Sequence, residues 1–300
     1  MPFAGLALAD HAELFRRAEA AGYDDFWTGD TNGADGFTPL VLAAAHTERV
    51  RLGTGIVNPF TRGPAVLAQH AAALADASRG RFVLGLGSSS NVIVERWNGV
   101  PFEKPLSKVR AAVEGLRPVL AGERGLGGFK LETAPAYPIP IVVAALRGKM
   151  LGLAAQIADG AFTNFLPISG VPQVVEAFGA PDKELVCRFF CLPQPEAEGI
   201  GTARFLFAAY ATVPVYTEFF RWLGWRERID PMVEAWHGGD RAKALELVPE
   251  DLVREIFLFG SPEQMRERLA EFEAAGITTF VLSAMCGPDE VPALIDGLAP

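Results

Sequence analysis

Residues 50–90 contain the unit on which the fold prediction rests: VRLGTGIVNPFTRGPAVLAQHAAALADASRGRFVLGLGSSS. Short apolar runs stand at 50–57 and 81–87, and an Ala-rich segment of helical character separates them at 63–78. Both runs are nearly continuous rather than alternating with polar residues, which is typical of strands buried on both faces of a parallel sheet. The stretch therefore predicts a strand–helix–strand unit with parallel strands.

The same alternation extends through the rest of the chain. Further strands are predicted at 3–8, 23–28, 139–145, 161–165, 185–190 and 278–282, and further helices at 11–21, 39–47, 105–120 and 149–158. Eight such strands in 300 residues favour an α/β fold of the TIM (β/α)8 barrel type with insertions, whose strands close into a ring. An open doubly wound sheet is the alternative.

Residues 1–300 are expected to form this single domain, although two stretches interrupt the alternation. Residues 121–137 are rich in Gly and Pro and predict an insertion before the strand at 139–145. Residues 199–258 predict a variable helical region with many aromatic side chains. This region is either extra helix that covers the barrel, or the wall of a substrate pocket or a dimer surface.

Composition excludes several classes of protein. Half of the residues are hydrophobic, which is too many for a disordered chain. The net charge of −9 and the pI near 5.1 argue against a general binder of nucleic acid or anionic membranes. Every apolar run is too short to span a membrane, and the N-terminus lacks the pattern of a signal peptide. We therefore expect a cytoplasmic protein whose partner is a small molecule.

No metal site is expected. Cys187, Cys191 and Cys286 match neither a redox pair nor a zinc site in their spacing, and the four histidines show no metal-ligand spacing. Buried reduced thiols are the expected state of the cysteines.

Four segments that follow predicted strands could form a site, because the carboxyl ends of barrel strands carry function. In 53–64, two glycines within a strand predict a bulge or a close approach of backbone to a ligand. In 85–91, a Gly-x-Gly followed by three serines offers amides and hydroxyls to a phosphate, but it is neither a dinucleotide fingerprint nor a Walker A loop.

The other two segments carry charge. Arg147 and Lys149 begin a helix, where cations oppose the helix dipole, so they indicate either an anion bound between them or solvated surface charge. Asp30 follows the strand at 23–28 and could be an acid, a hydrogen-bond acceptor or the cap of a turn. Arg62 lies beside a helix N-terminus, which is a further position for an anion.

Five stretches in order resemble the luciferase-like monooxygenase superfamily and, within it, the deazaflavin-dependent (coenzyme F420) oxidoreductases. They are AAGYDDFWTGD (20–30), GTGIVNPFTRGP (53–64), SRGRFVLGLGSSS (78–90), ERWNGVPFEKP (95–105) and IPIVVAALRGKMLGLAAQIADGAFTN (139–164). The resemblance implies a bacterial luciferase-like TIM barrel with its cofactor at the carboxyl ends of the strands. It also implies a cis peptide bond between Gly55 and Ile56, which supports the cofactor ring.

The cofactor-binding residues implied by the resemblance are Gly55, Ile56, Asn58, Gly87, Ser88, Ser89, Ala144, Ala145, Leu146, Arg147, Gly148 and Lys149. Arg62 and Lys104 would join Arg147 and Lys149 around the polyanionic tail of the deazaflavin. Sugar-phosphate dehydrogenases of the family carry Asp-His where this chain has Asp30-Thr31, and their acidic residue after the Gly-rich loop has no match. Sugar-phosphate oxidation is therefore not expected, and Asp30 is the candidate catalytic residue, ahead of Glu95.

The implied activity is hydride transfer between coenzyme F420 and a small organic substrate. One alternative is an FMN-dependent luciferase-like monooxygenase, and another is a non-catalytic flavin- or deazaflavin-binding protein. Homodimer formation is expected from the resemblance alone.

Overall fold

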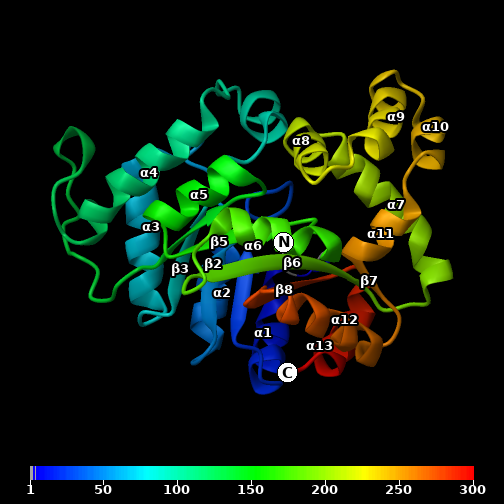
Figure 1. Cartoon of the computed structure of the whole chain (residues 1–300). Helices are drawn as coiled ribbons and strands as arrows, with labels where there is room; N and C mark the ends of the chain where they lie inside the picture. The colour runs from blue at the N-terminus through cyan, green and yellow to red at the C-terminus, as the bar shows by residue number, and fades with distance from the viewer. Residues whose placement is uncertain (1–2, 4) are drawn as a thin grey trace.

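The computed structural model describes residue 3 and residues 5–300, in which eight parallel strands curl into a barrel with helices outside (Figure 1). Neighbouring strands pair in the order β1-β2-β3-β4-β5-β6-β7, and β8 pairs with β6. The strands are β1 (Asp25–Thr28), β2 (Arg51–Thr54), β3 (Phe82–Leu86), β4 (Ile141–Ala144), β5 (Gly160–Asn164), β6 (Glu184–Leu192), β7 (Phe257–Phe259) and β8 (Thr279–Ala284). The α/β fold with a curled parallel sheet is confirmed.

Most helices pack on the outer face of the barrel. These are α1 (His11–Ala20), α2 (Thr38–His46), α3 (Pro64–Ala77), α4 (Pro105–Leu120), α5 (Gly148–Ile157), α6 (Val171–Phe178), α12 (Pro262–Ala274) and α13 (Val291–Gly297). Fully buried side chains such as Leu67, Leu116 and Leu151 join them to the strands in one apolar core. A smaller cluster of Val83, Val142, Phe162 and Val186 fills the inside of the barrel.

The prediction that the eight strands close into a ring is wrong, because β1 does not pair with β8. The described residues of the segment 3–8 contain no strand, and Ala4 lies outside the described residues. Gly5 has a positive φ of +82°, and Leu8–Asp10 form a 3-10 turn that leads directly into α1. As a result β1 and β8 share no hydrogen-bonded register, and a cavity of about 150 Å³ lies between them.

The end of the segment 199–258, which was predicted to be a variable helical region, overlaps a strand that the sequence pattern does not show. Phe257–Phe259 forms β7, which pairs with the carboxyl end of β6, from Phe190 to Leu192. It follows α11 (Glu250–Ile256) without a polar break, so the apolar run looks like a continuation of that helix. Before it come α7 (Glu196–Ala211), α8 (Pro214–Trp222), α9 (Arg226–His237) and α10 (Arg241–Glu246), which rise above the barrel on one side (Figure 1).

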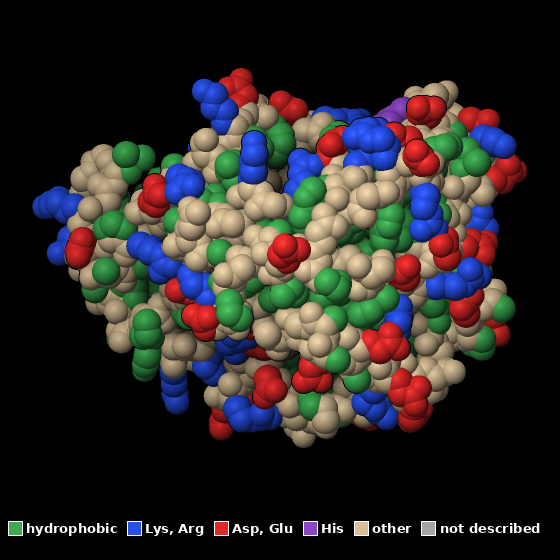
Figure 2. All heavy atoms as spheres, in the orientation of Figure 1, with side chains coloured by type: hydrophobic (Ala, Val, Ile, Leu, Met, Phe, Trp, Pro, Cys, Tyr) green, Lys and Arg blue, Asp and Glu red, His purple; other side chains and the backbone are tan. Residues whose placement is uncertain are grey.

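The segment 121–137 has little regular structure, with one short turn at Leu126–Gly128. It projects at the left of Figure 1, on the side opposite α7–α10. On the face shown in Figure 2, basic and acidic side chains are interspersed rather than gathered by sign. Among the described residues, no helix combines the length and the apolar character needed to cross a membrane. The three cysteines are free; Cys187 and Cys191 are buried as predicted, but Cys286, also predicted to be buried, is only half-buried.

Candidate active site

A cavity of about 210 Å³ opens at the carboxyl ends of the strands, where four of the predicted segments meet. Asp30 from the end of β1, Gly55 and Ile56 after β2, Ser88 and Ser89 after β3, and Ala144, Ala145 and Leu146 at the end of β4 all line it. Parallel strands bring their carboxyl ends to one edge, so segments far apart in sequence share one wall. Eight of the predicted site residues are therefore placed together.

The backbone after β2 departs from the strand at the predicted place. The peptide bond Gly55–Ile56 is cis, and the strand β2 ends at Thr54 rather than at residue 57. Both neighbouring segments hold this bulge. The Gly55 amide donates to the Thr28 carbonyl, the Asp30 amide donates to the Ile56 carbonyl at 2.9 Å, and the Val57 amide donates to the Gly85 carbonyl at 3.1 Å.

Two glycines next to the bulge leave no room for a side chain. A Cβ on Gly85 would lie 1.7 Å from the Thr54 carbonyl oxygen, and a Cβ on Gly29 would lie 2.6 Å from the Gly55 carbonyl oxygen. The hydroxyl of Thr54 adds a reciprocal contact, since it donates to the Gly85 carbonyl and accepts from the Gly85 amide. The glycines that the sequence places here thus allow three strand ends to pack backbone against backbone.

The serine loop after β3 and the end of β4 form adjacent parts of the cavity wall, because the two strands are paired. Gly87 is buried behind the surface, where an added Cβ would meet Ala144 at 2.7 Å and Ile56 at 3.0 Å. Ser88 and Ser89 are half-buried, and Ser89 has a positive φ of +60°. Both serines line the cavity beside the small or apolar residues Ala144, Ala145 and Leu146.

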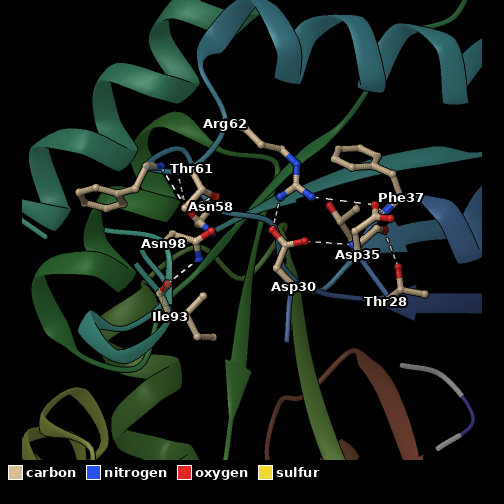
Figure 3. A network of polar contacts seen from close by, with 12 residues as sticks. Thr28, Asp30, Asp35, Phe37, Asn58, Thr61, Arg62, Ile93 and Asn98 are labelled. Atoms are coloured by element: carbon tan, nitrogen blue, oxygen red, sulfur yellow. Dashed lines mark hydrogen bonds and ion pairs between the residues drawn. The ribbon is translucent and has the colours of Figure 1, made fainter. Parts of the chain in front are cut away.

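Asp30 lines the cavity and is paired with a cation (Figure 3). The Arg62 guanidinium donates to Asp30 Oδ2, and the Gly36 amide donates to Asp30 Oδ1 at 3.0 Å. Asp35 lies 3.9 Å from the same guanidinium. Arg62 was expected near the cofactor tail, but two carboxylates already face it. Asp30 is a hydrogen-bond acceptor in this arrangement.

Several predicted residues lie outside the cavity wall. Asn58 is fully buried, and its Oδ1 accepts from the Phe60 and Thr61 amides, so it shapes the turn before α3 (Figure 3). Arg147, Gly148 and Lys149 begin α5 just beyond Leu146. Arg147 is 41% exposed and stands 4.0 Å from Glu218, and Lys149 is exposed.

The exposed cations Lys104 and Lys149 and the exposed Glu95 do not line the cavity either. A carboxylate oxygen of Glu95 accepts from the Phe102 amide at 3.1 Å, which gives this side chain a role in the local chain path.

Further parts of the cavity wall come from residues that the sequence analysis did not single out. Asn164 at the end of β5, Arg188 in β6, and Tyr210 and Tyr216 from the region above the barrel all line the cavity. Arg188 Nε donates to Asn164 Oδ1 at 3.2 Å, and Asn164 Nδ2 donates to the Tyr216 hydroxyl at 2.9 Å. Burial raises the pKa of Tyr216 to about 12, so its phenol stays protonated. The signal in the sequence was the single charge within the apolar run CRFFC (187–191).

This donor set fits a planar aromatic group with a polar side chain. Ile56, Leu146, Phe162 and Ala144 supply an apolar surface for a ring, and the serine hydroxyls supply hydrogen bonds at one end. Arg147 and Lys149 lie just beyond, at the start of α5. The cavity thus has an apolar surface with hydroxyl groups beside it, and two basic side chains follow at the start of α5.

Comparisons with known proteins agree with this architecture. Residues 2–279 match the family described as Luciferase-like monooxygenase. The chain is 30% identical to Rv3520c of Mycobacterium tuberculosis (strain ATCC 25618 / H37Rv), which is named a coenzyme F420-dependent oxidoreductase, over 92% of this chain and 90% of that protein.

Two solved structures share the fold. The coenzyme F420 dependent tetrahydromethanopterin reductase from Methanopyrus kandleri superposes with a TM-score of 0.74 and 25% identity, over 98% of this chain and 94% of that one. The oxygenating constituent of 3,6-diketocamphane monooxygenase from Pseudomonas putida, in complex with FMN, superposes with a TM-score of 0.68 and 16% identity, over 98% and 93%. The chain belongs to the luciferase-like monooxygenase family.

Proposed function

We propose that this protein is an oxidoreductase that uses coenzyme F420 and acts on a small organic substrate in the cavity at the carboxyl ends of the strands. The observation that carries the proposal is the convergence of Gly55–Ile56, Ser88–Ser89 and Ala144–Leu146 on one cavity. The relatives named for F420 support the choice of cofactor.

The chain's own residues bind and orient in this proposal. The backbone at Gly55 and Ile56 and the side chains of Ala144 and Leu146 pack against the ring. Ser88 and Ser89 hydrogen-bond the polar chain attached to it, and Arg147 with Lys149 attracts its phosphate end. When bound, the deazaflavin supplies a two-electron hydride centre, and the apolar wall keeps water from it.

Asp30 is the proposed proton-handling residue. Its carboxylate lines the cavity and is held by Arg62 and the Gly36 amide, so its position is fixed before a substrate arrives. A carboxylate held as an acceptor can receive a proton from a substrate hydroxyl when the reaction runs toward oxidation.

An FMN-dependent monooxygenase is the second candidate, because the barrel that binds FMN in the Pseudomonas putida protein has the same fold. A non-catalytic cofactor-binding protein is the third. We also propose that residues 1–300 fold as a single domain, which calorimetric unfolding would test. We propose in addition a homodimer, which light scattering would test, and a cytoplasmic location, which cell fractionation would test.

An equilibrium titration of the purified apoprotein with F420 and with FMN separates the first two functions. We expect micromolar binding of F420 and no binding of FMN at the same concentrations. Binding of FMN without F420 would reverse the choice of cofactor. Absorbance changes of bound F420 on addition of candidate alcohols, ketones and enones separate an enzyme from a carrier, since a carrier leaves the visible band unchanged with all of them.

A further inference from the structure

Arg188 places a cation inside the barrel. Side chains alternate along β6, so Arg188 shares the inward face with Val186, which belongs to the interior apolar cluster. Cys187 and Phe189 point the other way, into the core beneath the helices. Arg188 lines the site cavity and also the cavity between β1 and β8. A charged side chain at this depth needs a partner.

The partners of Arg188 leave most of its guanidinium free. Nε donates to Asn164 Oδ1, and the guanidinium carbon lies 4.6 Å from the centre of the Phe190 ring. Neither Nη1 nor Nη2 makes a hydrogen bond, and no carboxylate lies within ion-pair distance, among the residues that the structure describes.

Unlike Arg188, three other partly buried arginines of the barrel have a carboxylate partner or several hydrogen-bond acceptors. Arg51 pairs with both Asp25 and Glu184, Arg62 pairs with Asp30, and Arg81 donates to four oxygen atoms of the backbone and one hydroxyl. These three hold the structure together. The free end of Arg188 instead faces the cavity, so its missing acceptor is expected to arrive with a ligand.

The groups around Arg188 determine what it can take. Tyr216 accepts a hydrogen bond from Asn164 and finds no acceptor for its own proton among the described residues, so its hydroxyl can donate into the cavity. Nη1 and Nη2 form a planar fork, which matches the two oxygens of a carboxylate better than a single neutral oxygen. Phe162 lines the same cavity and supplies an apolar contact for the rest of the molecule.

We infer that Arg188, with Asn164 and Tyr216, anchors a carboxylate of the substrate. The inference rests on the proposed function, because it places the reacting molecule in the cavity that holds the cofactor. Arg188 supplies the charge-assisted pair, Tyr216 supplies a further hydrogen bond, and Asn164 fixes the positions of both. The substrate class is thus a small organic acid whose reacting carbon lies between this anchor and the wall formed by Gly55, Ile56 and Ala144.

Calorimetric titration with two pairs of probes tests the anchor. Sodium benzoate is compared with benzamide, and sodium isobutyrate with isobutyramide, in protein with and without F420. We expect at least one acid to bind at least tenfold more tightly than its amide. Arg188→Gln should abolish that preference, Arg188→Lys should restore part of it, and Tyr216→Phe should weaken acid binding by about threefold, which corresponds to one lost hydrogen bond of ordinary strength.

The matched control is Arg124→Gln, at an exposed arginine in the 121–137 segment, which should leave every affinity unchanged. Equal binding of acid and amide in the wild type, or an acid preference that survives Arg188→Gln in a folded variant, overturns the inference. A variant that loses F420 affinity while acid binding persists would assign Arg188 to the cofactor and also overturn it. Acid binding that depends on Arg188 in a protein that binds no F420 would preserve the anchor and refute the proposed function.

Discussion

Asp30, which lines the cavity, forms an ion pair with Arg62, and their side chains are only 12% and 17% exposed. A pair this shielded from water is coupled more strongly than an ion pair at the surface, because solvent screens it less. Asp30 reaches this position from the end of β1, and Arg62 reaches it from the turn before α3. The pair therefore joins two of the segments that build the site.

A double-mutant cycle measures this coupling. With Asp30→Asn and Arg62→Gln, urea unfolding should give a coupling free energy of about 1 to 3 kcal/mol. The cycle of Asp35→Asn with Arg62→Gln is the control, and its coupling should stay below about 0.5 kcal/mol because Asp35 is more exposed and 3.9 Å away. Equal coupling in the two cycles would contradict the geometry.

Gly85 should not tolerate a methyl group. Its added Cβ would lie 1.7 Å from the Thr54 carbonyl oxygen, which is backbone and cannot rotate away. Gly85→Ala should lower the free energy of unfolding by about 3 kcal/mol or more. Gly152→Ala in α5 is the control: nothing lies within 4 Å of its added Cβ, so the helix should gain about 0.5 to 1 kcal/mol. Thermal unfolding of both variants decides the matter, and equal midpoints would be inconsistent with the tight packing.

Charge reversal at the start of α5 should weaken cofactor binding. Arg147→Glu places a negative charge beside the proposed phosphate position, and F420 affinity should fall about tenfold, or about 1.4 kcal/mol, at low salt and less at high salt. Arg110→Glu on α4 has a similar exposed fraction, 43% against 41%, and should leave the affinity unchanged. Equal F420 affinity of Arg147→Glu and wild type would place this arginine in solvent only.

Alkaline pH should destabilise the protein partly through Tyr216. Burial raises the pKa of Tyr216 to about 12, whereas an unfolded tyrosine titrates near 10. The unfolded chain releases this proton first, so the contribution is complete below pH 10 and is lost as the pH rises toward 12, by about 2 to 3 kcal/mol.

Urea unfolding at pH 8 and pH 11 tests this dependence. Tyr216→Phe should lose less stability between the two pH values than the wild type does. The same pH slope in both proteins would mean that the folded phenol titrates like an unfolded one.

The sequence predicted seven of the eight strand positions and the part of the cavity wall that follows β1 to β4, because those features depend on local pattern. Gly55, the serines at 88 and 89, and Ala144 each follow a buried strand, and parallel strands must end at one edge. The missed strand β7 has three residues and continues the apolar pattern of α11, so no local signal separates them.

Tertiary contacts explain the other differences. Arg62 looked free in sequence, yet Asp30 neutralises it from 32 residues away. The network of Asn164, Arg188 and Tyr216 joins residues 24 and 52 positions apart, a distance that no motif spans. The apolar run at 3–8 has the composition of a strand, but in its described residues Gly5 has a positive φ and a 3-10 turn begins at Leu8, so none of them pairs between β1 and β8.

A crystal structure of the protein with bound F420 would show whether the cofactor lies in the cavity at the carboxyl ends of the strands. We expect the deazaflavin ring to lie against Gly55, Ile56 and Ala144, with the phosphate side chain running past Ser88 and Ser89 toward Arg147. Density for the ring in the cavity between β1 and β8, or on the outer surface of the barrel, would contradict it.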